Sequence, residues 1–122
     1  MNIKNFFIIF IILLLIDSIF LFSISKFFQS QIISVQKTPV KYDIISIVLF
    51  YFFISLAFNY FIVDKKSSNI LDPMILGLVI YGVYETTSKA LLSEWKWLTV
   101  LIDTIWGSIF FGLVSIVYKK LN

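Results

Sequence analysis

Three acidic residues lie deep inside the apolar stretches of this sequence: Asp17, Glu85 and Asp103. Two of them sit in nearly identical hexapeptides, LIDSIF at residues 15–20 and LIDTIW at residues 101–106. An ionisable side chain inside such a stretch is costly unless it is paired, protonated or hydrated. The three carboxyl groups are therefore the first candidates for a functional site, and the chemistry they offer is the binding of protons or of a cation.

The stretches that hold these acids are long enough to cross a membrane. A helix needs about 20 apolar residues to span a hydrocarbon core of roughly 30 Å. Four segments meet this requirement: residues 5–25, 44–63, 73–92 and 97–118. Asp72 and Pro73 suit the start of the third segment, because aspartate caps helix N-termini and proline is favoured in the first turn. The sequence predicts an all-α, integral membrane four-helix bundle that forms a single domain over residues 1–122.

Composition supports a membrane protein and excludes several kinds of site. Sixty per cent of the residues are apolar and only 14% are charged, unlike a typical soluble domain. The absence of cysteine and histidine removes disulfides, thiolate nucleophiles, histidine bases and the usual ligands of zinc, copper and haem iron. We expect no metal site and no cofactor. The net charge of +3 forms no basic stripe with interleaved aromatic residues, so we expect no nucleic-acid partner.

The residues between and beside the spans indicate which parts of the chain lie at the membrane interface and how the chain is oriented. Residues 26–43 mix apolar side chains, among them Phe27, Phe28, Ile32 and Ile33, with polar ones, and we expect this segment to lie along the membrane interface. Trp95 and Trp97, at the start of the fourth span, also suit the interface. Lysine counts on the two sides differ by one residue at most; they favour both termini in the cytoplasm of a multi-pass protein.

The three acids are predicted to lie at one depth. At about 1.5 Å per residue, Asp17 and Glu85 lie roughly 18 Å from the start of their spans, and Asp103 lies roughly 9 Å from the start of its own. The first and third spans run in the same direction and the fourth runs back. All three acids then fall in one leaflet, where a compact bundle would gather them into one pocket.

Neighbours on each helix face extend the expected pocket. Residues three or four positions apart share a face, which places Tyr81, Ser88 and Lys89 beside Glu85. Glu85 and Lys89 have the favourable order for an ion pair, although Lys89 could equally extend to the headgroups. On the fourth span, the Trp106 N–H could bind Asp103 or a ligand.

Other polar and small residues have simpler explanations. Tyr51, Ser55 and Asn59 form a polar stripe on the second span, and its spacing motivates the hypothesis of a hydrated path. Gly77 on the third span and Gly112 on the fourth belong to small-residue seams, which usually allow helices to approach closely. Buried carboxyl groups can likewise serve only as hydrogen-bonding contacts between helices. Three at one depth favour a functional pocket instead.

The stretch YGVYETTSKALLSEWKWLTVLIDTIWG, residues 81–107, resembles the hallmark region of the domain-of-unknown-function 2177 family of small predicted membrane proteins. That family pairs a Tyr-Asp-Leu-Thr-Asn motif with a downstream tryptophan and an Asp-x-x-Trp-Gly motif. The matching residues are Tyr84, Thr87, Trp95, Asp103, Trp106 and Gly107. Glu85 replaces the family's aspartate and Ser88 its asparagine. The resemblance implies a four-helix membrane protein without an established activity, and it adds Tyr84 and Thr87 to the expected site.

Three functions compete for this pocket. The favoured one is a carrier or pore that binds or transports protons, a cation or a small polar solute, and four short spans suggest a homo-oligomer. The second is a membrane-embedded enzyme that modifies lipids; the sequence has no Gly-x-Ser-x-Gly motif and no phosphate loop, so enzymatic activity is less favoured. The third is an accessory or assembly subunit, whose acids would pair with basic residues of a partner in the bilayer.

Overall fold

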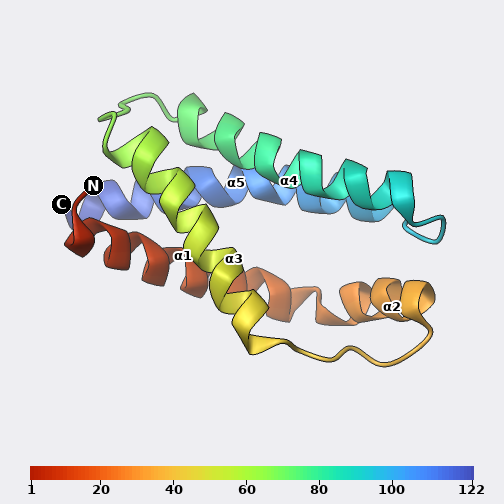
Figure 1. Cartoon of the computed structure of the whole chain (residues 1–122). Helices are drawn as coiled ribbons and strands as arrows, with labels where there is room; N and C mark the ends of the chain where they lie inside the picture. Colours follow the sequence, from red (N-terminus) through yellow and green to blue (C-terminus); the bar gives the residue numbers. More distant parts are fainter.

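The computed structural model describes all 122 residues, and every regular element in it is a helix. The α-helices are α1 (Ile3–Ser23), α2 (Ser25–Gln36), α3 (Ile44–Phe58), α4 (Leu71–Leu91) and α5 (Trp97–Leu121). A short π-helix, η1 (Asn59–Val63), extends α3. The prediction of an all-α chain is confirmed, and both termini lie at the same end of the molecule (Figure 1).

Three of the helical segments are long and apolar enough to cross a membrane: α1, α3 together with η1, and α5. The third predicted span, residues 73–92, lies in α4, a helix of 21 residues that carries Asp72, Glu85 and Lys89 and is not among the candidate membrane spans. The structure therefore supports a membrane protein with three candidate spans.

The start of α4 differs from the sequence-based expectation. The helix begins at Leu71, two residues before Pro73, and Asp72 lies in its first turn instead of capping it. The Leu71 amide donates to the Asn69 side chain (2.9 Å), while the Ser67 hydroxyl donates to Asp72 (2.7 Å). The prediction of Asp72 as the N-cap was wrong because Asn69, two residues before Leu71, satisfies the first free amide.

Helices α4 and α5 form a closely packed antiparallel hairpin around two glycines. A Cβ added to Gly77 would collide with the carbonyl oxygen of Gly107, and one added to Gly107 would lie 2.6 Å from the carbonyl oxygen of Gly77. Only glycine permits this contact between the two backbones. The expectation that Gly77 allows a close helix approach is confirmed, and the approach brings the acids of both helices to one interface.

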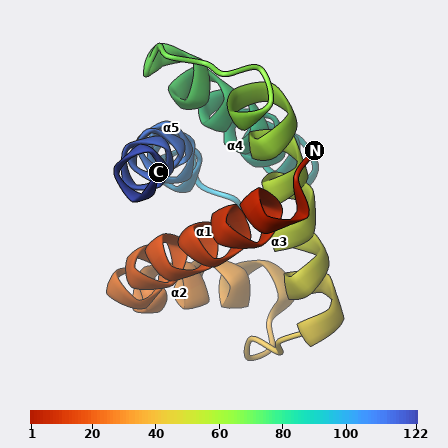
Figure 2. The ribbon, with the colours of Figure 1, turned by 90° about the vertical axis from the view of Figure 1, so that its left-hand side faces the viewer.

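Helices α1 and α3 complete the bundle. Figure 2, which looks from the end that carries the termini, shows α1, α3, α4 and α5 arranged around a common interior, with α3 inclined to the others. The core is aromatic and aliphatic; its fully buried members include Ile9, Leu13, Phe58, Phe110 and Phe111. The first half of α3, residues 44–50, is exposed on all sides. Only the second half of α3 therefore packs into the core.

The connection between α1 and α3 contains a helix. Residues 25–36 form α2, which follows a break at Ile24 and lies beside the turn between α4 and α5 (Figure 1). The position of this helix at a membrane interface stays a prediction. At the start of α3, the Asp43 carboxylate accepts hydrogen bonds from the Ser46 hydroxyl (2.7 Å) and the Ile45 amide (3.2 Å), and these bonds lower the pKa of Asp43.

Candidate functional site

Asp17 joins three helices. Its Oδ2 accepts a hydrogen bond from the Tyr51 hydroxyl on α3 (2.7 Å), and its Oδ1 accepts one from the indole N–H of Trp106 on α5 (3.1 Å). The Asp17 side chain is buried. Both carboxyl oxygens thus have a donor, which is the condition under which a carboxyl group is tolerated inside a bundle.

The indole of Trp106 is fixed by aromatic stacking. It lies parallel to Phe20 of α1, with ring centroids 4.1 Å apart, and nearly parallel to Phe110 of α5, with centroids 5.3 Å apart. This stacking fixes the indole in the orientation in which its N–H donates to Asp17. The sequence suggested Asp103 or a ligand as the partner of the Trp106 N–H; in the structure the long indole side chain reaches across to Asp17 on the neighbouring helix.

Glu85 is fully buried and only half satisfied. Its Oε1 accepts a hydrogen bond from the Trp95 indole (2.8 Å), whereas its Oε2 has no hydrogen-bond partner. Trp95 was expected at the membrane interface, but it is buried and folds back from the α4–α5 turn onto Glu85. It is a site residue that hydropathy alone could not find; only the family motif singled it out.

The buried Asp103 carboxyl group has two acidic neighbours, Glu85 on α4 and Asp17 on α1. The Tyr81 hydroxyl lies near both aspartates and has no hydrogen-bond partner. The only ion pair in the chain joins the Met1 amino group to Asp64, at 3.9 Å. The structure therefore brings Asp17, Glu85 and Asp103 together with Tyr81 and Trp106, and no lysine pairs with any of the three acids. We call Asp17, Glu85 and Asp103 the acid cluster.

The remaining predicted site residues lie elsewhere. Lys89 forms no ion pair with Glu85, and its ammonium nitrogen lies 5.6 Å from the ring centroid of Trp97. Tyr84 and Thr87 are exposed, and the Ser88 hydroxyl donates to the Tyr84 carbonyl oxygen (3.0 Å). These four side chains lie outside the acid cluster. Glu85 points to the interior of the bundle, and they lie on the more exposed sides of α4.

A buried glutamine on α2 fixes the turn that carries Trp95. The Gln31 Oε1 accepts hydrogen bonds from the Lys96 amide (2.9 Å) and the Thr99 hydroxyl, and its Nε2 donates to the Glu94 carbonyl oxygen (2.9 Å). Sequence reasoning missed Gln31 because its partners lie more than 60 positions away. This clamp positions Trp95 over Glu85.

The polar stripe of α3 faces the interior. Tyr51, Ser55 and Asn59 are all buried, and Tyr51 contacts the acid cluster directly. The side chains of the chain offer no group of three or more ligands that could hold a metal ion. The arrangement is suited to hydrogen bonding and proton exchange among carboxyl and hydroxyl groups.

Comparison with known proteins places most of the chain in one family. The model of a family described as a predicted membrane protein, DUF2177, matches residues 2–118. This range contains every residue of the acid cluster and both tryptophans that bind it. No curated protein and no solved structure matches the chain.

Proposed function

The chain belongs to the DUF2177 family of predicted membrane proteins, and from this premise we propose that it binds protons at Asp17, Glu85 and Asp103 and exchanges them within the bilayer, as a proton-coupled carrier or pore. The observation that carries the proposal is the burial of Glu85 and Asp103 as neighbouring acids, with no lysine paired to either. Two neighbouring buried carboxyl groups without a cation are stabilised when one of them holds a proton, because two like charges at such a site repel each other.

A membrane topology of four spans supports this role. Helix α4 has 21 residues, or about 32 Å at 1.5 Å per residue, which is enough to cross a bilayer. Asp72 lies in its first turn and Lys89 in its last, where both reach the headgroups, and Glu85 faces the protein interior. An even number of spans also agrees with the position of both termini at one end of the bundle (Figure 1).

Several features favour protons over a metal cation. Both oxygens of Asp17 are occupied by neutral donors, and the acids do not form a set of metal ligands. The Tyr81 hydroxyl is buried without a hydrogen-bond partner, so it is free to bind water or a small polar solute. We expect such a solute to be the co-substrate of the carrier, and a homo-oligomer to be its working form.

The two alternatives receive less support from the same geometry. The acids of an accessory subunit would have to reach a partner's basic residues, but Asp17 and Glu85 are buried and bonded within their own chain. A lipid-modifying enzyme would need its acid and base open to lipid. At 8% exposure or less, none of the three carboxyl groups is open.

Proton flux into liposomes tests the proposal. The protein is reconstituted with an internal pH dye, a potassium diffusion potential is applied, and the wild type is compared with Asp17→Asn and Asp103→Asn. Each asparagine can keep a hydrogen bond, because its NH₂ can donate to the Tyr51 oxygen or to the Glu85 carboxylate, respectively. We expect both variants to fall to the rate of protein-free liposomes.

The matched control is Asp72→Asn, which changes an exposed acid outside the cluster. This variant should conduct as the wild type does. Wild-type flux that survives both cluster substitutions would refute the acid cluster as the proton site.

A further inference from the structure

The buried face of α3 carries a line of polar side chains that leads away from the acid cluster. Tyr51, Ser55 and Asn59 are spaced four residues apart and share one helix face. Their exposed fractions are 5%, 0% and 0%. A line of hydroxyl and amide groups with no access to solvent or lipid is unusual in so apolar a helix.

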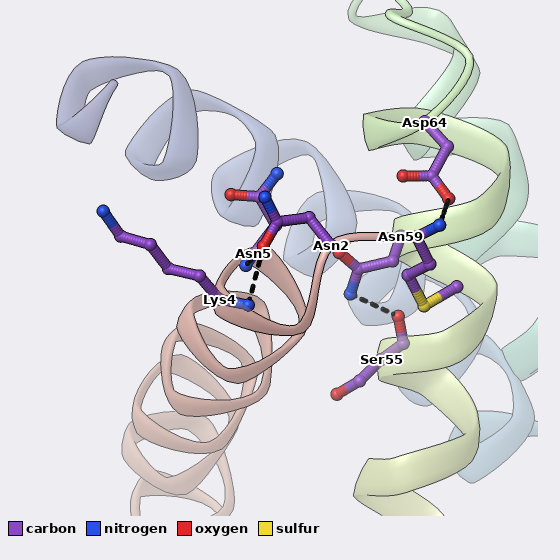
Figure 3. A network of polar contacts seen from close by, with 7 residues as sticks. Asn2, Lys4, Asn5, Ser55, Asn59 and Asp64 are labelled. Atoms are coloured by element: carbon purple, nitrogen blue, oxygen red, sulfur yellow. Dashed lines mark hydrogen bonds and ion pairs between the residues drawn. The ribbon is translucent and has the colours of Figure 1, made fainter.

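Two atoms of this line have no partner within the protein. The Ser55 hydroxyl and the Asn59 Oδ1 form no hydrogen bond. The side-chain nitrogen of Asn59, Nδ2, donates only to the Ser55 carbonyl oxygen (2.8 Å; Figure 3). In folded proteins the great majority of buried polar atoms have a hydrogen-bond partner, and ordered water is the usual partner where the protein supplies none. Ser55 and Asn59 therefore point to bound water.

The helix changes its winding at the same place. At Asn59 the α-helix α3 gives way to the π-helix η1, and the Asn59 carbonyl oxygen accepts from the Asp64 amide five residues on (2.7 Å). Short π-helices interrupt α-helices frequently at functional sites. The change in winding thus marks Asn59 independently of its missing hydrogen bond.

The line has one end at the acid cluster and the other near the face of the bundle that carries the termini. At the first end, the Tyr51 hydroxyl donates to Asp17. At the second, the Asn59 side chain extends from α3 toward the start of α1, where the Met1 amino group pairs with the partly exposed Asp64 (Figure 3). From Tyr51 to Asn59 the line covers about 12 Å along the helix axis.

On the opposite side of the acid cluster, toward the turn between α4 and α5, the Gln31 side chain is hydrogen-bonded at both its oxygen and its nitrogen. There, Trp95 donates to Glu85, and Gln31 binds Thr99, the Lys96 amide and the Glu94 carbonyl oxygen. The Gln31 side-chain amide and the Trp95 indole N–H are therefore engaged within the protein, whereas Glu85 Oε2 is not. The two sides therefore differ: the polar line of α3 has atoms free to bind water, and the Gln31 side chain has its hydrogen bonds within the protein.

We propose that Tyr51, Ser55 and Asn59 hold a chain of water molecules that connects the acid cluster to the membrane face at which both termini lie. Successive members of the line are about 6 Å apart along the helix, a gap that one water bridges with two hydrogen bonds of about 2.8 Å. The inference rests on the proposed function and adds the side from which protons reach the acids.

Water-edited solid-state NMR of the wild-type protein in liposomes tests the water chain without any substitution. Magnetisation that starts on water should reach the Ser55 and Asn59 side chains quickly. Two residues serve as controls: Leu56, which faces lipid on the same helix, and Thr99, which is equally buried but bonded to Gln31. Transfer to Ser55 and Asn59 that is no faster than transfer to Leu56 would overturn the proposal, and equally fast transfer to Thr99 would overturn its one-sided access.

Flux measurements then separate the water chain from the acid cluster. Ser55→Ala and Asn59→Leu remove the polar atoms and leave the acids in place, and we expect both to slow proton entry, with Leu56→Ala unchanged. If Asp103→Asn abolishes wild-type flux and both α3 variants conduct normally, the water chain is refuted and the acid cluster stands. If the wild type conducts no protons, the proposed function fails, and the NMR comparison alone decides whether the line holds water.

Discussion

The indole N–H of Trp106 on α5 donates a 3.1 Å hydrogen bond to Asp17 on α1, 89 positions away. Its partner is therefore not Asp103, which lies three residues earlier on the same helix. This bond links the two LIDxIΩ hexapeptides, in which Ω is the aromatic residue Phe20 or Trp106. The aspartate of the first copy accepts a hydrogen bond from the aromatic residue of the second, and the two aromatic rings stack. The two similar hexapeptides thus contact each other twice, through the hydrogen bond from Trp106 to Asp17 and through the stacking of Trp106 on Phe20.

Replacing Trp106 by phenylalanine should destabilise the bundle by about 1–3 kcal/mol, the cost of leaving a buried acceptor unpaired. Phenylalanine keeps most of the stacking surface against Phe20 and Phe110, so the loss reports the hydrogen bond. The free energy of unfolding is measured by titration with a denaturing detergent. Trp97→Phe, at an exposed position, is the control and should change little.

Tyr51→Phe, measured in the same way, completes a double-mutant cycle with Trp106→Phe. Both donors serve one carboxyl group, so the two losses should not add. Strict additivity would show that Tyr51 and Trp106 do not act on Asp17 as a unit.

The glycine contact between α4 and α5 predicts a strong effect of a single methyl group. In Gly107→Ala, the new Cβ would lie 2.5 Å from Tyr81 Cγ and 2.6 Å from the Gly77 carbonyl oxygen, so the hairpin must open. We expect a loss of about 1–3 kcal/mol from this overpacking. Gly82→Ala is the matched control, because its Cβ would meet only Thr104 Cγ2, at 3.5 Å.

Alanine at position 82 should be neutral or should stabilise the helix by up to about 1 kcal/mol, since glycine is unfavourable inside a helix. Thermal unfolding in detergent compares the two variants. Equal stability of Gly107→Ala and Gly82→Ala would contradict the close backbone approach.

Gln31→Ala should loosen the turn that carries Trp95. It removes the acceptor of the Lys96 amide and the donor to the Glu94 carbonyl oxygen. Hydrogen exchange at the Lys96 amide should become faster, and the fluorescence of Trp95 should shift toward that of a solvated indole. Gln29→Ala, an exposed neighbour on α2, should leave both signals unchanged.

A protected Lys96 amide in Gln31→Ala would show that the turn is held by other contacts. In that case α2 would not position the site.

Much of the architecture follows from local patterns in the sequence. The apolar length of α1, α3 with η1, and α5 predicts helices that can cross a bilayer, and the spacing of Tyr51, Ser55 and Asn59 predicts one polar face. Gly77 was expected to permit close packing for the same local reason. These features depend on residues within a few turns of one helix, which is why periodicity reveals them.

The contacts of the acids depend on distant residues, and the sequence could not predict them. The Asp17 donors come from α3 and α5, and the Glu85 donor comes from the turn after α4. Four of the nine expected site residues, Tyr84, Thr87, Ser88 and Lys89, lie outside the cluster. Helix spacing placed Ser88 and Lys89 beside Glu85, and the family motif added Tyr84 and Thr87. The direction in which Glu85 points, however, is set by how α4 packs against α5.

The central claim is that Glu85 and Asp103 share a proton inside the bundle, and infrared spectroscopy of the protein in liposomes tests it most directly. At neutral pH the wild type should show the C=O stretch of a protonated carboxyl group, and this band should be lost in Asp103→Asn and kept in Asp72→Asn. A wild-type spectrum without a protonated carboxyl band, or a band that Asp103→Asn leaves unchanged, would contradict the account.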